Sequence, residues 1–114
     1  MCFISQAGPS APRLTIVPEE QARGEGESAT LNCQPAPGSP RPPRLAWFKN
    51  DEPVPPTDPR VRVELGIGGG SRLVLSDLRH SDRGVFRCVA TNAPATTYAL
   101  ARLEVHGTWI VFGF

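Results

Sequence analysis

The sequence lacks the features of several large protein classes. No apolar stretch is long enough to cross a membrane as a helix, and no segment has a persuasive helical repeat of apolar residues. The formal charge is close to balanced, at +1. Such a chain has no long-range attraction to nucleic acid or to an anionic membrane. We therefore expect no nucleic-acid partner and no membrane span in this chain.

Residues that carry chemistry are also scarce. The two histidines, His80 and His106, have no third partner at a ligand spacing, so a zinc site is not expected. His80-Ser81-Asp82 contains the residue types of a hydrolytic triad, but three adjacent residues cannot point at one another, and we interpret them as a polar turn. No Lys-Ser/Thr pair follows the glycines of 66–70, which argues against a phosphate loop. We predict that the chain is not an enzyme and binds no cofactor.

The chain carries no recognisable route to the secretory pathway. Residues 1–8 have neither the basic start nor the apolar core of a signal peptide, and no Asn-x-Ser/Thr acceptor for N-glycosylation occurs. The apolar run of 109–112 would favour aggregation if it were exposed. These features predict a fragment or short variant of a longer protein, in which Cys2 is a terminal thiol.

Thirteen prolines and eleven glycines divide the chain into short runs, which suits strands joined by turns. The row of Val61, Val63 and Leu65 predicts a half-buried strand. Residues 34–44 are too rich in proline for a central strand and are predicted to form a loop. Apolar alternation predicts strands at 14–17, 29–33, 44–50, 61–65, 73–75, 85–90 and 97–105.

Five short motifs carry the clearest family signal. They are Gly26-Glu27-Ser28 leading to Leu31-x-Cys33, Trp47-Phe48-Lys49, Leu73-x-Leu75, Asp82-x-Gly84-x-Phe86-x-Cys88 and Ala90-x-Asn92. Through these motifs, residues 12–106 resemble an intermediate-set immunoglobulin domain, the kind found in arrays in cell-adhesion receptors, matrix proteins and giant muscle proteins. No single motif is specific, but together they are typical of the fold.

The resemblance implies an all-β Greek-key sandwich of two packed antiparallel sheets. Residues 1–11 would be a disordered N-terminal segment and 107–114 an apolar tail. A disulfide would join Cys33 to Cys88, 55 residues apart. Asp82 would accept hydrogen bonds in the turn before the second cysteine, and Gly84 would relieve crowding there. The implied core residues are Leu31, Trp47, Leu73, Leu75 and Phe86.

Two positions depart from the family pattern. Phe86 stands where family members usually carry a tyrosine, whose hydroxyl bonds back to the backbone. The absence of that hydrogen bond costs about 0.5–1.5 kcal/mol. Family members often have glycine three residues after the asparagine of the last hairpin, where this chain has Ala95 after Asn92. We therefore expect a wider turn in that hairpin.

The resemblance favours a non-enzymatic protein-binding, adhesion or spacer module of a multidomain cell-surface or extracellular-matrix protein. Its partner would be a protein, such as another immunoglobulin-like domain. Paired cysteines favour an extracellular location, because disulfides persist in oxidising compartments. The missing signal peptide favours the alternative, a cytoplasmic module of a muscle or cytoskeletal giant protein that acts as an elastic spacer or docking unit with reduced cysteines.

Two sequence features suggest a partner-binding surface. Residues 37–43 contain overlapping Pro-x-x-Pro spacings, but the nearby arginines fit neither usual SH3-ligand orientation, so an ordinary loop is favoured. A basic cluster near one end of the sandwich would bind sulfated glycosaminoglycans, although acidic residues are interspersed in the sequence. The five candidates for this cluster are Arg41, Arg44, Lys49, Arg60 and Arg62.

Overall fold

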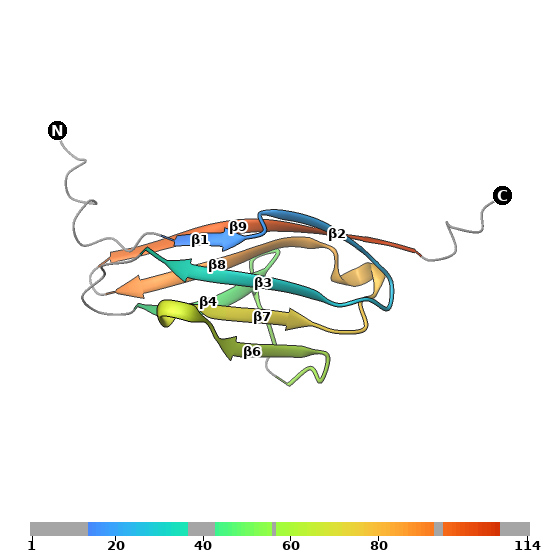
Figure 1. Ribbon diagram of the computed structural model, residues 1–114, viewed down its shortest axis with the longest axis horizontal. Coiled ribbons are helices and arrows are strands. Elements are labelled where there is room, and N and C mark those ends of the chain that lie inside the picture. The colour runs from blue at the N-terminus through green and yellow to red at the C-terminus, as the bar shows by residue number, and fades with distance from the viewer. Residues whose placement is uncertain (1–13, 37–42, 56, 93–94, 108–114) are drawn as a thin grey trace.

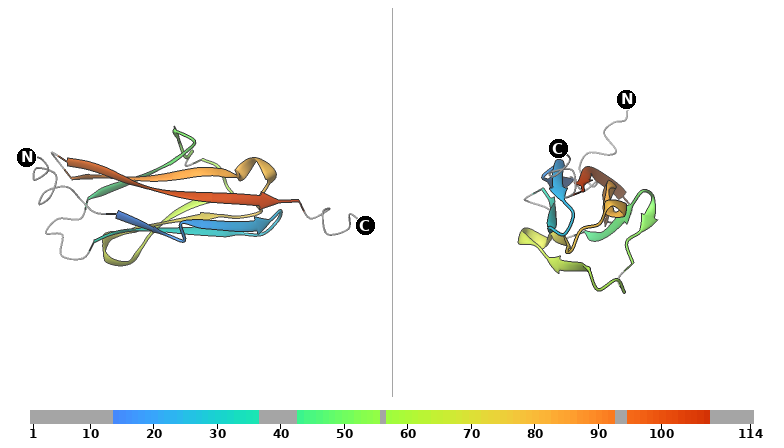
Figure 2. Two further views of the ribbon diagram at one scale, coloured as in Figure 1. Left: turned by 90° about the horizontal axis from the view of Figure 1, so that it is seen from above. Right: turned by 90° about the vertical axis from the view of Figure 1, so that its right-hand side faces the viewer.

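The computed structural model describes residues 14–36, 43–55, 57–92 and 95–107 (Figure 1). In these ranges, two sheets pack face to face, as the two layers in Figure 2 show. The strands are β1 (Leu14–Val17), β2 (Glu20–Gly24), β3 (Ala29–Pro35), β4 (Arg44–Lys49), β5 (Glu52–Pro53), β6 (Val61–Leu65), β7 (Ser71–Leu75), β8 (Gly84–Asn92) and β9 (Ala95–His106). Two 3₁₀ turns, η1 (Ile67–Gly69) and η2 (His80–Asp82), lie between strands.

The strand order explains how the chain builds both layers. One sheet has the order β1-β3-β7-β6, and the other has the order β2-β9-β8-β4-β5. Neighbouring strands are antiparallel except β2 and β9, which are parallel. Successive strands β3 and β4 belong to different sheets, as a Greek-key sandwich requires. The predicted all-β sandwich is confirmed.

Burial alternates along the central strands, because successive side chains point to opposite faces of a sheet. In β3, Ala29, Leu31 and Cys33 are buried, whereas Thr30 and Asn32 are partly exposed. The buried rows of the two sheets form one core cluster. This cluster contains the five core residues that the resemblance implied, which are Leu31, Trp47, Leu73, Leu75 and Phe86.

A disulfide and a tryptophan connect the layers at the centre of the core. Cys33 of one sheet is bonded to Cys88 of the other, with a Cα–Cα distance of 6.4 Å. Trp47 lies beside Cys88 on the adjacent strand. Its indole Nε1–H donates a 2.9 Å hydrogen bond to Oγ of Ser71, which belongs to the opposing sheet. Burying such a large side chain stabilises the fold by several kcal/mol, at about 25 cal/mol per Å².

The expectation of a half-buried row in 61–65 is wrong for most of that strand. Val61 packs against the core, but Val63 is 58% exposed and Leu65 is 92% exposed. The reason is position, because β6 is the last strand of its sheet and the opposing sheet ends in the two-residue strand β5. The inward-facing side chains toward the end of β6 therefore lie beyond the area that the five-stranded sheet covers.

Two local features also differ from the sequence expectations. The sequence does not predict β2, because Glu20–Gly24 has no apolar row and is held at the sheet edge by pairing with β9. The expectation of a wide last turn is wrong, because the β8–β9 register continues to Asn92 and Ala95. Only two residues separate this last pair, which is the commonest hairpin spacing.

Several sequence predictions fall outside the described residues. These concern the N-terminal segment, the proline-rich residues 37–42 with Arg41, and the apolar residues 108–114. No helix within the described ranges is long and apolar enough to cross a membrane.

Candidate protein-binding face

The outward side of the five-stranded sheet gathers side chains from β4, β8 and β9. On β8, Phe86 and Cys88 point into the core, so Val85 and Arg87 point outward. The register places Phe48 on one side of Arg87 and Leu100 on the other. We use the name outer face for Phe48, Val85, Arg87, Tyr98 and Leu100.

The outer face carries apolar side chains that the fold leaves uncovered. Val85 is 37% exposed, Tyr98 is 59% exposed and Leu100 is 50% exposed. Single exposed apolar residues are ordinary on protein surfaces. Here, however, Tyr98 and Leu100 are neighbours on the same side of β9, and Leu100 lies diagonally across from Val85. The three side chains therefore form a contiguous apolar patch.

Arg87 lies in the middle of this patch and is held by aromatic rings. Its guanidinium carbon is 5.1 Å from the centre of the Phe48 ring and 5.8 Å from the centre of the Tyr98 ring. Nη1 lies 3.5 Å from Oδ1 of the exposed Asp51. Stacking on aromatic rings contributes about 0.5–1 kcal/mol at an exposed site and limits the rotamers of the arginine. The guanidinium is thus oriented before any partner binds.

The same surface is hollowed and carries charges of both signs. A shallow depression of about 390 Å³ is lined by Asn50, Asp51, Val85, Arg87, Tyr98 and Leu100. Beside it, Arg102 and Glu104 line a second open depression, and their side chains lie 3.9 Å apart. Apolar side chains around a stacked arginine, with further charged groups at the margin, fit a protein–protein interface, in which aromatic residues and arginine are enriched.

The predicted basic cluster does not form among the described residues. Arg44 and Lys49 stand at opposite ends of β4, about 17 Å apart at the usual rise of a strand. Lys49 donates to the backbone carbonyl of Ser81. Arg62, on the other sheet, pairs with Glu64 at 2.9 Å.

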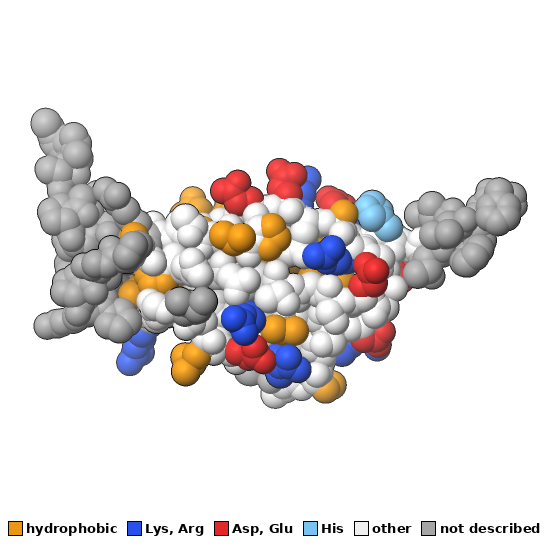
Figure 3. Space-filling view, viewed as in Figure 1, with side chains coloured by type: hydrophobic (Ala, Val, Ile, Leu, Met, Phe, Trp, Pro, Cys, Tyr) orange, Lys and Arg blue, Asp and Glu red, His pale blue; other side chains and the backbone are white. Residues whose placement is uncertain are grey.

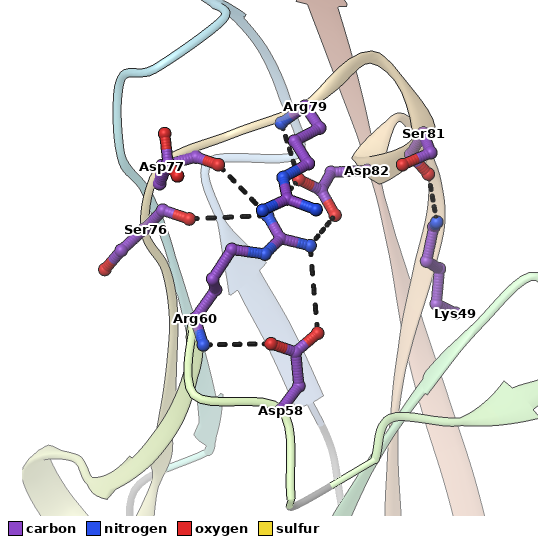
Figure 4. A network of polar contacts seen from close by, with 8 residues as sticks. All are labelled: Lys49, Asp58, Arg60, Ser76, Asp77, Arg79, Ser81 and Asp82. Carbon is purple, nitrogen blue, oxygen red and sulfur yellow. Dashed lines mark hydrogen bonds and ion pairs between the residues drawn. The ribbon is translucent and has the colours of Figure 1, made fainter.

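Arg60, the remaining candidate, is held in a polar network (Figure 4). Its Nη1 is 2.7 Å from Oδ2 of Asp82 and 3.0 Å from the carbonyl oxygen of Asp77, and its backbone N–H donates to Asp58. A guanidinium engaged in this way is not available to a sulfated ligand. The described basic residues therefore do not support a glycosaminoglycan site.

Asp82 accepts hydrogen bonds in the turn, as predicted, but its principal partner was not foreseen. Its Oδ2 accepts from the backbone N–H of Arg79 at 2.7 Å, in addition to the bond from Arg60. His80 and Ser81 lie in the same 3₁₀ turn, η2, with their side chains exposed. Because the carboxylate of Asp82 faces Arg60 and the Arg79 amide, the three consecutive residues form a structural turn.

The ion pair shifts the pKa values of both partners. Its hydrogen bond with Asp82 raises the pKa of Arg60, and burial opposes this in part. For Asp82, burial is the largest single influence and raises the pKa. The hydrogen bonds from Arg60 and from the Arg79 amide, together with nearby positive charge, outweigh burial and hold the pKa of Asp82 below its ordinary value.

Gly84 follows this turn, and the side chain of Asn50 lies close against it. A Cβ at Gly84 would lie 2.8 Å from Oδ1 of Asn50. That oxygen accepts a 3.0 Å hydrogen bond from the Val85 N–H. Within the described ranges, no group of three His, Cys, Asp or Glu side chains is placed to hold a metal ion.

The strand order, the buried Cys33–Cys88 bond and Trp47 beside it together match one family. The family model for the immunoglobulin domain matches residues 11–92. The chain belongs to the immunoglobulin domain family. It is an intermediate-set domain, and its relatives include immunoglobulin domains of titin. A chain in the crystal structure of the titin M10–obscurin-like 1 complex superposes with a TM-score of 0.67 and 26% identity, over 85% of this domain and 96% of that chain.

The curated relatives that this immunoglobulin domain matches are much longer proteins. Protein turtle of Drosophila melanogaster is 34% identical over 101 residues, which cover 88% of this chain and 6% of that protein. The muscle M-line assembly protein unc-89 of Caenorhabditis elegans is 37% identical over 97 residues, which cover 85% of this chain and 1% of that protein. The chain therefore spans a small fraction of these relatives.

Proposed function

We propose that this immunoglobulin domain is a non-enzymatic protein-binding module of a multidomain cell-surface or extracellular-matrix protein. It binds its partner through the outer face. The observation that carries the proposal is the contiguous exposure of Val85, Tyr98 and Leu100 around the stacked Arg87. Tyrosine and arginine are among the residue types that most often dominate binding energy in protein interfaces.

The geometry of Arg87 favours a protein partner that carries a carboxylate. Phe48 and Tyr98 already restrict its rotamers, so binding loses less side-chain entropy than it would at a free arginine. Its neighbour Asp51 is exposed and 3.5 Å away, a weak pairing that a partner carboxylate can replace. Another immunoglobulin-like domain is one such partner.

The extracellular assignment rests on the buried disulfide. A bond such as Cys33–Cys88 persists in oxidising compartments and is rare in the cytosol. Mass spectrometry of native material, alkylated before and after reduction, measures this directly. Equal masses for alkylated Cys33 and Cys88 with and without reductant would show free thiols and would contradict the extracellular proposal.

A second candidate is a docking or spacer unit inside muscle or another cytoskeleton, which the similarity to unc-89 favours. In that case Cys33 and Cys88 pack as thiols. The same alkylation experiment distinguishes the two candidates, because free thiols in native material support this one.

Capture from biotin-labelled cell-surface proteins tests the use of the outer face. The immobilised chain is compared with Leu100→Glu, which places a charge in the apolar patch, and with Val17→Glu. Val17, on β1 of the other sheet, is exposed to a similar degree and serves as the matched control. We expect a partner that Val17→Glu retains and Leu100→Glu loses. Equal recovery by both variants would contradict the proposal.

A further inference from the structure

The four-stranded sheet ends in an unusually exposed strand. β6 pairs with β7 on one side and is the terminal strand of its sheet. Val63 and Leu65 point to the inward side of the sheet, yet both are exposed there, Leu65 almost completely. Proteins commonly protect such edges, because unpaired backbone groups and apolar side chains together attract another strand. This edge lies apart from the outer face.

The hydrogen bonds between β6 and β7 determine which backbone N–H and C=O groups of β6 face the open edge of the sheet. At the two ends of the β6–β7 hairpin, Ser76 N–H donates to the carbonyl of Arg60 at 2.9 Å, and Gly66 N–H donates to the carbonyl of Gly70 at 2.8 Å. Bonded pairs alternate along an antiparallel ladder. Every second residue counted from Arg60 is therefore bonded to β7, and the residues between them turn their N–H and C=O groups toward the edge. These residues are Val61, Val63 and Leu65.

The sequence of β6, Val-Arg-Val-Glu-Leu, is complementary to itself when it is read in the opposite direction. With Val63 at the centre, Arg62 and Glu64 stand at equal distances on either side. Both belong to the outward row of the strand, where they already pair with each other. Figure 3, which presents this sheet, shows acidic and basic side chains side by side over β6 and β7.

We propose that two copies of this domain associate edge to edge through β6, antiparallel about a two-fold axis at Val63. The axis places Arg62 opposite Glu64 of the second copy, and Glu64 opposite Arg62. On the inward side it places Val61 opposite Leu65 of the second copy and Val63 opposite itself. Opposite charges and apolar pairs are the combinations that stabilise neighbouring strands.

The N–H and C=O groups that face the edge belong to the residues that this pairing brings into hydrogen-bonding position. Val63 N–H donates to the Val63 carbonyl of the second copy, and Leu65 N–H donates to its Val61 carbonyl, each twice by symmetry. The N–H of Val61 is already bonded to the carbonyl of Asp58, 3.0 Å away, and needs no partner. The two four-stranded sheets become continuous, and the interface is closed because a two-fold contact uses the same surface on both copies.

Charge reversal tests the pairing by sedimentation velocity of the full chain over a range of concentrations. All variants carry Cys2→Ser, so that no disulfide between copies contributes. We expect the apparent mass to rise from 12.3 kDa toward twice that value as concentration increases. Arg62→Glu alone and Glu64→Arg alone each place like charges opposite each other, and we expect a loss of dimer of tenfold or more. The double exchange Arg62→Glu/Glu64→Arg restores complementarity and the dimer.

Two further measurements separate β6 from any other contact. A mixture of the Arg62→Glu and Glu64→Arg single variants should form heterodimers, because their charges are complementary. Val63→Pro removes an N–H that faces the edge, a position where an edge strand tolerates proline, so the domain should fold and remain monomeric. A monomer at every concentration, or a dimer that the single charge variants and Val63→Pro leave unchanged, would overturn the proposal.

Discussion

Arg60 and Asp82 form a two-point ion pair that joins the start of β6 to the turn before β8. Nη1 of Arg60 is 2.7 Å from Oδ2 of Asp82, and Nη2 is 3.1 Å from Oδ1. Both side chains are largely buried. Because the same carboxylate also accepts a hydrogen bond from the Arg79 amide, its removal would leave a partly buried guanidinium and an N–H without their shared partner.

Asp82→Ala should therefore destabilise the domain by about 1–3 kcal/mol, since it removes the hydrogen bonds from Arg60 and from the Arg79 amide at a partly buried site. Urea unfolding measures the change. Glu52→Ala, on the exposed strand β5, is the control and should change the unfolding free energy by less than about 0.5 kcal/mol. Similar results for the two variants would show that the ion pair contributes little.

The lowered pKa of Asp82 predicts that part of the folding stability of the domain is lost at low pH. A carboxylate whose pKa is lower in the folded chain than in the unfolded chain stabilises the fold. That contribution is fully present at pH values above the unfolded-chain pKa of about 3.9. That contribution is lost as pH falls through the folded pKa. The stability difference between the wild type and Asp82→Asn should therefore be constant near neutral pH and shrink below about pH 4. A difference that does not change down to pH 2 would disprove this linkage.

The buried hydrogen bond between Trp47 and Ser71 gives a second stability prediction. Ser71→Ala leaves the indole N–H without a partner inside the core, which should cost about 1–3 kcal/mol. Adding Trp47→Phe removes both partners, so the two changes together should cost less than the sum of the single changes. Additive values in a thermal-unfolding cycle would mean that the indole finds another partner.

Gly84 is favoured both by its φ of +154°, which L side chains rarely adopt, and by its neighbour Asn50. Gly84→Ala puts a methyl group 2.8 Å from the side-chain oxygen of Asn50, and overpacking of this kind costs about 1–3 kcal/mol. In an Asn50→Gly background the obstruction is absent and only the strain of the Gly84 φ of +154° remains, so the same substitution should cost less. A cost of Gly84→Ala that is equal in both backgrounds would refute the contact as its cause.

The sequence predicts the centre of the sandwich well because its signals there are local. Cys33, Trp47 and Cys88 each lie in a short motif on a strand covered by the opposing sheet. Alternation along such a strand reports burial directly. The same argument fails for Val63 and Leu65, because apolar alternation does not reveal that the opposing sheet stops short of an edge strand.

The sequence does not predict the outer face, for a related reason. Arg87 and Leu100 become neighbours only through the β8–β9 register, and Phe48 joins them from β4. The basic residues that the sequence suggested are instead separated, and Arg60 is engaged by Asp82. Pairing between residues distant in sequence, which composition and spacing do not specify, decides both outcomes.

The most direct test of the proposed outer face is the dissociation constant of the captured partner, measured by titration against three forms of the chain. Leu100→Glu, which places a charge in the apolar patch beside Arg87, should weaken binding at least tenfold, about 1.4 kcal/mol. Val17→Glu, with similar exposure on the other sheet, should bind like the wild type. A Leu100→Glu affinity equal to that of the wild type, or a loss confined to Val17→Glu, would contradict the account.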